Sequence, residues 1–279
     1  MSNKSIVTTQ PGSQAQGMVV QAMSPWKDII RPELEKASPM LIRLAPNQFK
    51  KQVEDGRLLT ALLAATKKTP SILACDPKSI VLAMAQAASV GIIPGSLCKH
   101  ADFIPYGPEL QFQLRYAGLV ELAMRTGRIA KVRGVSVYEA DEFILEEGTE
   151  DRIIHRPALK NRGTDANIIG AYGVVKYRDG STQFRWLDRD ALDKRKAKSQ
   201  GGGTKGPWKD WFKEMCDKTG IKYVLSQASL SDTEESEVLG KALAHDDGEP
   251  IDVSEHYDME SDVTPQSTAV AGSLAAQAQ

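Results

Sequence analysis

The clearest indication of architecture is the segment 168–187, which reads IIGAYGVVKYRDGSTQFRWL. Two apolar runs, 168–177 and 181–187, flank the triplet Arg178-Asp179-Gly180. An Asp-Gly pair between two such runs favours a tight antiparallel connection, because both residues tolerate the positive φ angles of the turn. The segment therefore predicts a β-hairpin.

The residues before this hairpin contain further short extended runs. Val132, Val135 and Val137 lie in one of them, and a turn at Gly148 separates two others. Because strands follow one another here without intervening helices, they favour an antiparallel sheet over alternating βαβ units. The strands predicted before the hairpin are 103–107, 110–114, 131–138, 142–146 and 152–155.

Apolar residues at helical spacing dominate the first hundred positions. Asp76-Pro77 is typical of an N-cap followed by a first-turn proline, and Gly91 is typical of a helix end. Gly127 closes a later helix in the same way, and Asp188 is a candidate N-cap. The predicted helices are 32–45, 47–53, 57–66, 77–90, 116–125, 188–198 and one that starts at Pro207.

Together these elements predict an α+β fold with an N-terminal helical lobe, a central antiparallel β-sheet packed with long helices, and disordered termini. We expect residues 1–24, which are polar and lack hydrophobic periodicity, to be disordered. Residues 25–98 would form the helical lobe and residues 99–230 the α+β core. Residues 231–279 would form an acidic, disordered C-terminal tail.

The apolar runs and the cysteines of the sequence bear on where in the cell the protein is expected. No run of 18 apolar residues and no signal-peptide pattern at the start is present, so we expect a cytoplasmic protein without a membrane span. Cys75, Cys98 and Cys216 are widely spaced and match no zinc-ligand pattern. We expect them to be reduced thiols that act as small buried hydrophobes.

The net charge of −1 conceals a strong asymmetry along the chain. From Val224 onward twelve acidic residues face a single basic residue, Lys241, so this part carries −11 and residues 1–223 carry +10. A basic body followed by an acidic tail suggests a polyanion-binding domain with an interaction or masking segment.

The densest basic segment runs from Arg185 to Lys222 and holds eleven cations against six anions. Each phosphate that such a strip neutralises releases counterions, which favours sequence-independent binding to a nucleic-acid backbone. The glycine-rich loop 199–206 lies within it and is interpreted as a flexible hinge. The eleven cations are Arg185, Arg189, Lys194, Arg195, Lys196, Lys198, Lys205, Lys209, Lys213, Lys218 and Lys222.

A second basic set lies on the helix 116–125 and around the strand that follows it. If the sheet and the helices pack as expected, both sets could line one groove. The second set consists of Arg115, Arg125, Arg128, Lys131 and Arg133. The residues that we assign to DNA contact are Arg115, Tyr116, Arg125, Arg128, Arg133, Arg195, Lys198, Lys205, Trp208, Lys218 and Lys222.

Aromatic residues accompany the first basic segment. Trp208 and Tyr223 would each contribute about 1–3 kcal/mol per stacked base if they were exposed. Aromatic residues at helical spacing more often belong to a core, so Trp208, Trp211 and Phe212 are interpreted chiefly as packing residues of one helix. Gly220 lowers the helical propensity of that segment.

Three other functions remain open from the residues alone. A metal-dependent nuclease could use the carboxylates between Glu139 and Asp151, although their spacing matches no metal-nuclease pattern. A sequence-independent coat for RNA or duplex DNA would need the same cations, and a structural scaffold would bind neither. His100 and His155 have no partners at zinc or triad spacing, and no G-x-x-x-x-G-K-[ST] loop indicates ATP use. We therefore assign no catalytic residue, metal site or cofactor.

Several collinear motifs over residues 72–229 resemble the RecT family of phage recombinases. In this pattern Gly220 stands where alanine usually follows Lys-Thr. The motifs are Ala87-Ala88-Ser89-Val90-Gly91-Ile92-Ile93-Pro94-Gly95, His100-Ala101, Ile104-Pro105-Tyr106-Gly107, Tyr116 to Gly127, Val137-Tyr138-Glu139-Ala140-Asp141-Glu142-Phe143, Ile154-His155-Arg156-Pro157, Pro207-Trp208, Glu214-Met215 and Lys218-Thr219.

The resemblance implies a function that composition alone does not give. It implies an ATP-independent protein, encoded by a phage or prophage in a bacterial cell and linked in fold to lambda Red beta. Such a protein coats single-stranded DNA as a ring or helical filament, holds the backbone in a narrow basic groove and anneals complementary strands into a duplex intermediate. A phage exonuclease and a host single-strand-binding protein are the implied partners. The acidic tail would lie outside the core as a site for the exonuclease, for the host protein or for regulation, and any Mg²⁺ would act on the DNA.

Overall fold

The computed structural model describes residues 30–199 and 203–246 and confirms the α+β class. The expected disorder of residues 1–24 and the centre of the glycine-rich loop lie outside the described residues. The helices are α2 (Arg31–Leu44), α3 (Asn47–Glu54), α4 (Arg57–Lys68), α5 (Pro77–Ser89), α6 (Tyr116–Arg125), α7 (Arg189–Lys198), α8 (Pro207–Asp210), α9 (Phe212–Leu225) and α10 (Glu234–Asp246), with 3-10 turns η2 (Pro70–Ala74) and η3 (Asp165–Asn167).

The strands form three antiparallel sheets in the described chain. The predicted hairpin is confirmed as β6 and β7, and β3 pairs with the other edge of β6. The other two sheets are the pairs β1–β2 and β4–β5. The strands are β1 (Ala101–Tyr106), β2 (Glu109–Leu114), β3 (Ile129–Tyr138), β4 (Glu142–Glu146), β5 (Arg152–Arg156), β6 (Ile168–Tyr177) and β7 (Thr182–Asp188).

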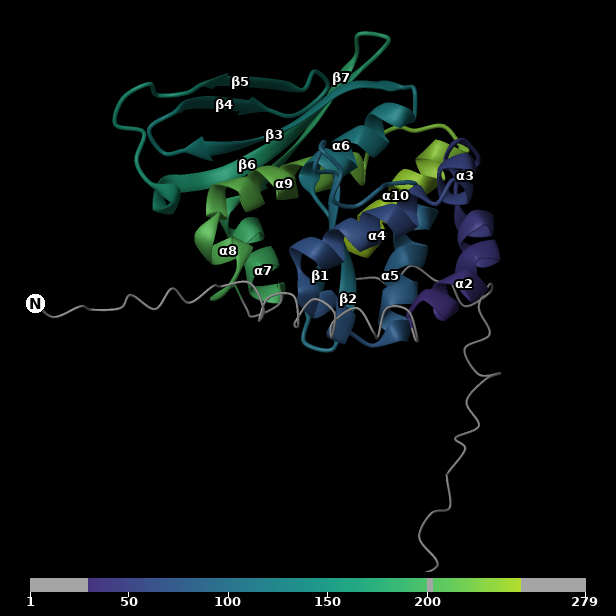
Figure 1. Ribbon diagram of the computed structural model, residues 1–279. Helices are drawn as coiled ribbons and strands as arrows, with labels where there is room; N and C mark the ends of the chain where they lie inside the picture. Colours follow the sequence, from purple (N-terminus) through teal and green to yellow (C-terminus); the bar gives the residue numbers. More distant parts are fainter. Residues whose placement is uncertain (1–29, 200–202, 247–279) are drawn as a thin grey trace, which may run out of the picture.

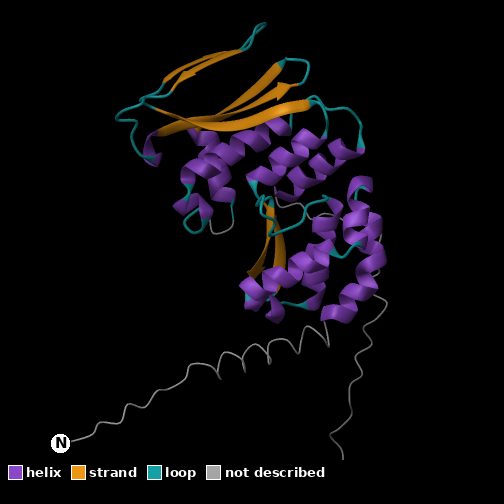
Figure 2. Cartoon of the chain, turned by 45° about the horizontal axis from the view of Figure 1, so that its top comes forward, coloured by secondary structure: helices purple, strands orange, loops and turns teal. Residues whose placement is uncertain are grey.

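The three-stranded sheet is covered on both faces. Figures 1 and 2 show α9 running along one face, with the other helices beyond it, and the β4–β5 hairpin lying over the opposite face. On that opposite face the ring of Phe143 contacts the rings of Tyr172 and Trp186, with centroids 5.9 and 4.7 Å apart. The molecule therefore has a hairpin layer, a sheet layer and a helical layer.

Glycines allow α9 to lie directly on the sheet. Gly134 of β3 and Gly173 of β6 are paired in register. A Cβ added to Gly134 would overlap the carbonyl oxygen of Asp217, and one added to Gly173 would overlap that of Gly220. From the helix side, a Cβ at Gly220 would lie 2.9 Å from the carbonyl oxygen of Tyr172. Gly220 thus does not interrupt α9, because its lack of a side chain permits this close backbone contact.

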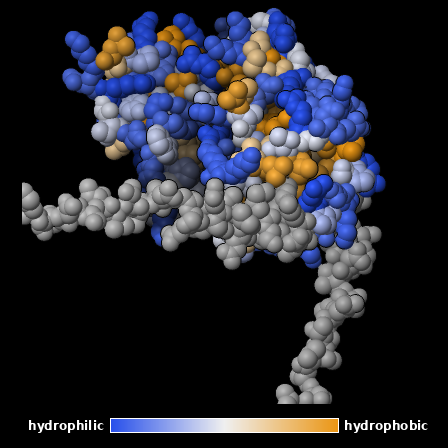
Figure 3. All heavy atoms as spheres, in the orientation of Figure 1, coloured by the Kyte–Doolittle hydropathy of each residue, from blue (hydrophilic) through white to orange (hydrophobic). Residues whose placement is uncertain are grey.

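The apolar core extends through both the helical lobe and the strands. One cluster of buried residues joins α2–α5, β1, β2 and α6 to the C-terminal half of α9 and to α10. A second cluster, which contains Tyr138, Leu192, Trp208 and Phe212, lies between the sheet, α7 and α8. Figure 3 shows that hydrophobic residues on this face gather over the helical part, whereas hydrophilic residues cover most of the sheet part. No helix within residues 30–199 and 203–246 is both long and apolar enough to span a bilayer.

Three expectations were wrong. The helix expected from Pro207 is interrupted at Trp211, whose φ of −138° and ψ of 50° separate α8 from α9. The acidic tail is not disordered throughout, because Glu234–Asp246 forms α10 and buries Val238 and Leu239. Cys75 and Cys216 are buried as expected, but Cys98 is exposed. Burial raises the pKa of Cys216 to about 12.

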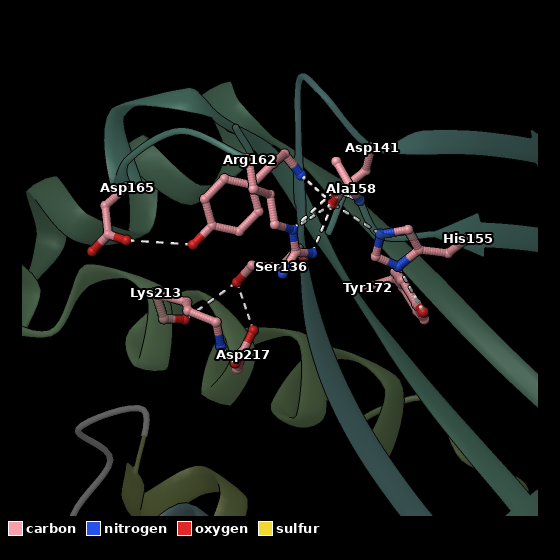
Figure 4. A network of polar contacts seen from close by, with 10 residues as sticks. Ser136, Asp141, His155, Ala158, Arg162, Asp165, Tyr172, Lys213 and Asp217 are labelled. Atoms are coloured by element: carbon pink, nitrogen blue, oxygen red, sulfur yellow. Dashed lines mark hydrogen bonds and ion pairs between the residues drawn. The ribbon is translucent and has the colours of Figure 1, made fainter. Parts of the chain in front are cut away.

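A buried carboxylate anchors the β4–β5 hairpin to the end of β3 (Figure 4). Asp141 accepts hydrogen bonds from Arg162 (2.7 and 2.9 Å), from the backbone N–H groups of Tyr138 and Ala158, and lies 3.0 Å from Nε2 of His155. Burial alone would raise the pKa of Asp141, but these hydrogen bonds lower it well below its ordinary value. The carboxylate is therefore charged and fully engaged.

We predict opposite effects for two Gly→Ala substitutions. Gly173→Ala should lower the free energy of unfolding by about 3 kcal/mol, because α9 must move away from the sheet to make room. Gly240→Ala in α10, where nothing lies within 4 Å of the added Cβ, should raise it by about 0.5–1 kcal/mol. Urea denaturation measures both, and equal effects would show that the close helix–sheet contact is absent.

Loss of the Asp141 anchor should be costly. Asp141→Asn should lower the free energy of unfolding by about 3 kcal/mol at pH 7, because it leaves a partly buried arginine without its charge partner. Since folding lowers the pKa of Asp141, its contribution is complete above the ordinary value of about 3.9 and declines as the pH falls below it.

Glu142→Gln provides the matched control on the same hairpin. Glu142 pairs with Arg156, and both side chains are exposed, so its loss should cost at most about 1 kcal/mol. Denaturation across pH 3 to 7 should show a flatter acid limb for Asp141→Asn only. A loss of similar size in both variants would contradict the assigned anchor.

Candidate nucleic-acid interface

Helix α9 presents two different faces. Toward the sheet, Asp217 accepts a hydrogen bond from the hydroxyl of Ser136 (2.5 Å). Asp217 also forms an ion pair with Lys213 (2.6 Å). Lys218 and Lys222 lie one helical turn apart, away from this sheet contact. Lys213, one of the eleven cations, is thus occupied at the sheet, whereas Lys218 and Lys222 lie away from the sheet and are only 20 and 17% exposed.

Both of these lysines contact the end of α10. The Nζ atoms of Lys218 and Lys222 lie 2.6 and 2.8 Å from the two carboxylate oxygens of Asp246. Lys218 also donates to the carbonyl of Leu114 at the end of β2 (3.4 Å). Burial alone would raise the pKa of Asp246, but the two ammonium groups lower it, so the carboxylate is charged.

Helix α7 brings further cations to the neighbourhood of α9. The capping carboxylate of Asp188 accepts from the backbone N–H of Ala191 (2.8 Å), which confirms the predicted N-cap. Arg195 lies with its guanidinium 5.4 Å from the ring centre of Tyr223 on α9. Lys198 and Lys205 are exposed and form no ion pair with another described residue. These cations are therefore available to an external anion.

The residues at the start of α6 lie beside Lys218. Arg115 directly follows Leu114, whose carbonyl Lys218 contacts, and it forms an ion pair with Asp102. Tyr116 is 58% exposed. Arg125, at the far end of the helix, instead pairs with Glu121 and donates to the carbonyl of Gly91 (2.8 Å). Arg115 and Tyr116 thus follow directly after a backbone contact of Lys218, whereas Arg125 holds α6 to the helical lobe.

The members of the second basic set do not all lie on one side of the sheet. Along β3, Gly134 and Ser136 face α9, so strand alternation directs Arg133 to the opposite face, where the β4–β5 hairpin lies. Arg128, just before β3, lies within 3.5 Å of the Ser231 hydroxyl. The expectation of a common groove is therefore wrong for Arg133, because the sheet separates it from α9.

The packing role expected of Trp208 is confirmed, but the one expected of Trp211 is wrong. Trp208 is only 7% exposed and packs against Phe212, with ring centroids 5.8 Å apart. Trp211 is 62% exposed. The helix break at Trp211 changes the helical phase, so the single-face periodicity assumed from the sequence does not hold across it. Trp208 is a core residue, and Trp211 is the tryptophan that can stack on a base.

The glycine-rich segment has the glycine spacing of a dinucleotide-binding loop. Gly201, Gly203 and Gly206 have the G-x-G-x-x-G spacing of dinucleotide-binding loops. That motif requires a preceding strand and a following helix, whereas this segment follows α7 and precedes α8. Its spacing therefore gives no support for a dinucleotide site.

The acidic residues considered for a nuclease are used differently. Asp141 accepts protein donors on both oxygens, and Glu142 pairs with Arg156. Among residues 30–199 and 203–246 no three His, Cys, Asp or Glu side chains gather closely enough to hold a metal ion. These carboxylates thus serve the hairpin in the described chain.

Sequence reasoning missed Asp246. A signal for α10 is present, because Val238, Leu239, Ala242 and Leu243 recur at helical spacing after three acidic residues of the first turn. The acidic composition of the surrounding segment outweighed this short pattern. The contact of Asp246 with lysines more than twenty positions earlier has no local signal at all.

Comparisons with known proteins place the chain in one family. Residues 56–263 match the RecT family. The chain is 30% identical over 205 residues to Protein RecT of Escherichia coli (strain K12), which covers 71% of this chain and 73% of that protein. It is 28% identical over 209 residues to the uncharacterized protein YqaK of Bacillus subtilis (strain 168), covering 70% and 69%. The chain therefore belongs to the RecT family.

Proposed function

We propose that this protein binds single-stranded DNA by its backbone and anneals complementary strands without ATP during homologous recombination. Membership of the RecT family supports the broader assignment to recombination and annealing. The observation that carries the finer assignment is a group of cations on α7, on α9 and in the segment that joins α7 to α8. We name this group the α7–α9 strip and define it by Arg195, Lys198, Lys205, Lys218 and Lys222.

The composition of the strip suits a ligand whose bases remain free. Lysine and arginine bind phosphates irrespective of sequence, whereas base reading needs side chains aimed at base edges. Annealing requires bound bases to stay available for a second strand. Arg115 and Tyr116 extend the strip at the start of α6.

The proposal includes an assembly and partners. Copies of the chain would coat the strand as a ring or helical filament in the bacterial cytoplasm, and a phage exonuclease and a host single-strand-binding protein would act beside it. Any Mg²⁺ would screen the DNA phosphates. Competition between single-stranded DNA, duplex DNA and RNA at equal salt tests the alternative of a general nucleic-acid coat, which would bind all three alike.

Two substitutions in the strip should weaken binding without changing its sequence preference. Lys198→Ala and Lys205→Ala should each flatten the plot of log Kd for single-stranded DNA against log salt by about 0.7, which is the loss of one phosphate contact. Fluorescence anisotropy at several salt concentrations measures the slope.

Two further variants locate the interface. Lys67→Ala, at the end of α4, should leave the slope unchanged. Arg133→Ala probes the hairpin side of the sheet and should also leave it unchanged. A flatter slope for Arg133→Ala together with normal slopes for both strip variants would place the DNA on the other face.

The two tryptophans should respond differently to substitution. Trp211→Ala should weaken DNA binding by about 1–3 kcal/mol and leave stability within about 0.5 kcal/mol, because an exposed ring stacks on a base. Trp208→Ala should lower the free energy of unfolding by about 3–5 kcal/mol. Anisotropy and urea denaturation of both variants measure these effects, and unchanged affinity in Trp211→Ala would exclude it as a stacking residue.

A further inference from the structure

Asp246 holds two lysines of the α7–α9 strip at once. Each of its carboxylate oxygens takes one ammonium group, Oδ1 from Lys218 at 2.6 Å and Oδ2 from Lys222 at 2.8 Å. The exposed fractions of the three side chains are 11, 20 and 17%. The three side chains therefore form a largely buried ion-pair cluster and not a solvent-exposed surface salt bridge, because most of each side chain is shielded from water.

The pair of lysines forms a site for a tetrahedral oxyanion as well as for a carboxylate. Two ammonium groups that converge on two oxygens of one anion can bind a phosphodiester in the same way. The carbonyl of Leu114, which accepts from Lys218, fixes the direction of that side chain without neutralising it.

Helix α10 is attached mainly by residues that precede Asp246. Val238, Leu239, Ala242 and Leu243 are buried in the main apolar cluster. In the last turn, the ring of His245 stacks on Phe112, and its Nε2 lies 3.0 Å from the Phe112 carbonyl oxygen. The apolar residues can therefore keep α10 docked when Asp246 leaves its two lysines, and in the last turn the contact of His245 with Phe112 must also be given up.

We propose that Asp246 occupies a backbone-phosphate site formed by Lys218 and Lys222, and that single-stranded DNA replaces it there. This inference rests on the proposed function. The acidic end of α10 acts as an internal competitor, so the chain binds DNA less tightly than its lysines alone would allow. Release involves the last turn of α10 and leaves the remainder docked on α6 and β2.

A matched pair of charge-neutral variants tests this proposal. Asp246→Asn should tighten binding to an oligothymidylate about tenfold and steepen the salt slope by about 0.7 for each phosphate gained. Glu237→Gln removes the same charge from an exposed position on the same helix. It therefore measures how much DNA binding changes when the protein merely loses one negative charge. Adding Lys218→Ala and Lys222→Ala to Asp246→Asn should abolish the gain.

The outcomes separate the inference from the function on which it rests. Equal affinity and slope in Asp246→Asn and Glu237→Gln, or weaker binding by Asp246→Asn, would show that Asp246 only tethers α10 and would overturn the proposal. Failure of the unsubstituted chain to bind the oligonucleotide would instead overturn the proposed function. Urea denaturation of each variant establishes that it is folded.

A measurement on the unsubstituted chain avoids any loss of folding in the variants. Hydrogen exchange should become faster in residues 244–246 when oligothymidylate is added, because the end of α10 is released. Residues 238–243, which include the buried apolar residues, should remain protected. Slower or unchanged exchange in residues 244–246 under saturating DNA would contradict displacement of Asp246.

Discussion

The structure depends on the direct contact between α9 and the three-stranded sheet. Gly134 and Gly173 lie side by side on adjacent strands, and Gly220 meets them from the helix, so backbone approaches backbone where side chains usually intervene. This contact fixes the rotation of α9 about its own axis. One helix face is committed to Ser136 and the sheet, and Lys218 and Lys222 are directed away from it.

The charge on the other face of α9 follows from this rotation, because that face carries Lys218 and Lys222. Arg195 of α7 lies over the ring of Tyr223 on α9, and the chain itself supplies an anion to Lys218 and Lys222. The charge asymmetry along the sequence thus has a structural counterpart, because part of the acidic segment folds back onto the basic body as α10.

The sequence predicted the local elements well because their signals are local. The Asp179-Gly180 turn, the Asp188 cap and the helix end at Gly91 all appear where expected. The site was predicted less well, because it depends on which face of a helix or strand each side chain occupies and on contacts between residues far apart in the sequence. The break at Trp211 leaves that side chain exposed although it was expected to pack, and the sheet separates Arg133 from α9. The partner of Lys218 and Lys222 comes from a segment whose composition suggested no fold.

The most direct test of the central claim is a fluorescence annealing assay with two complementary oligonucleotides and no ATP. The account predicts that the protein, added to one strand before the second, accelerates duplex formation at moderate salt and loses this effect at high salt, with both oligonucleotides remaining full length. Annealing no faster than without protein, or shortening of either strand, would contradict it.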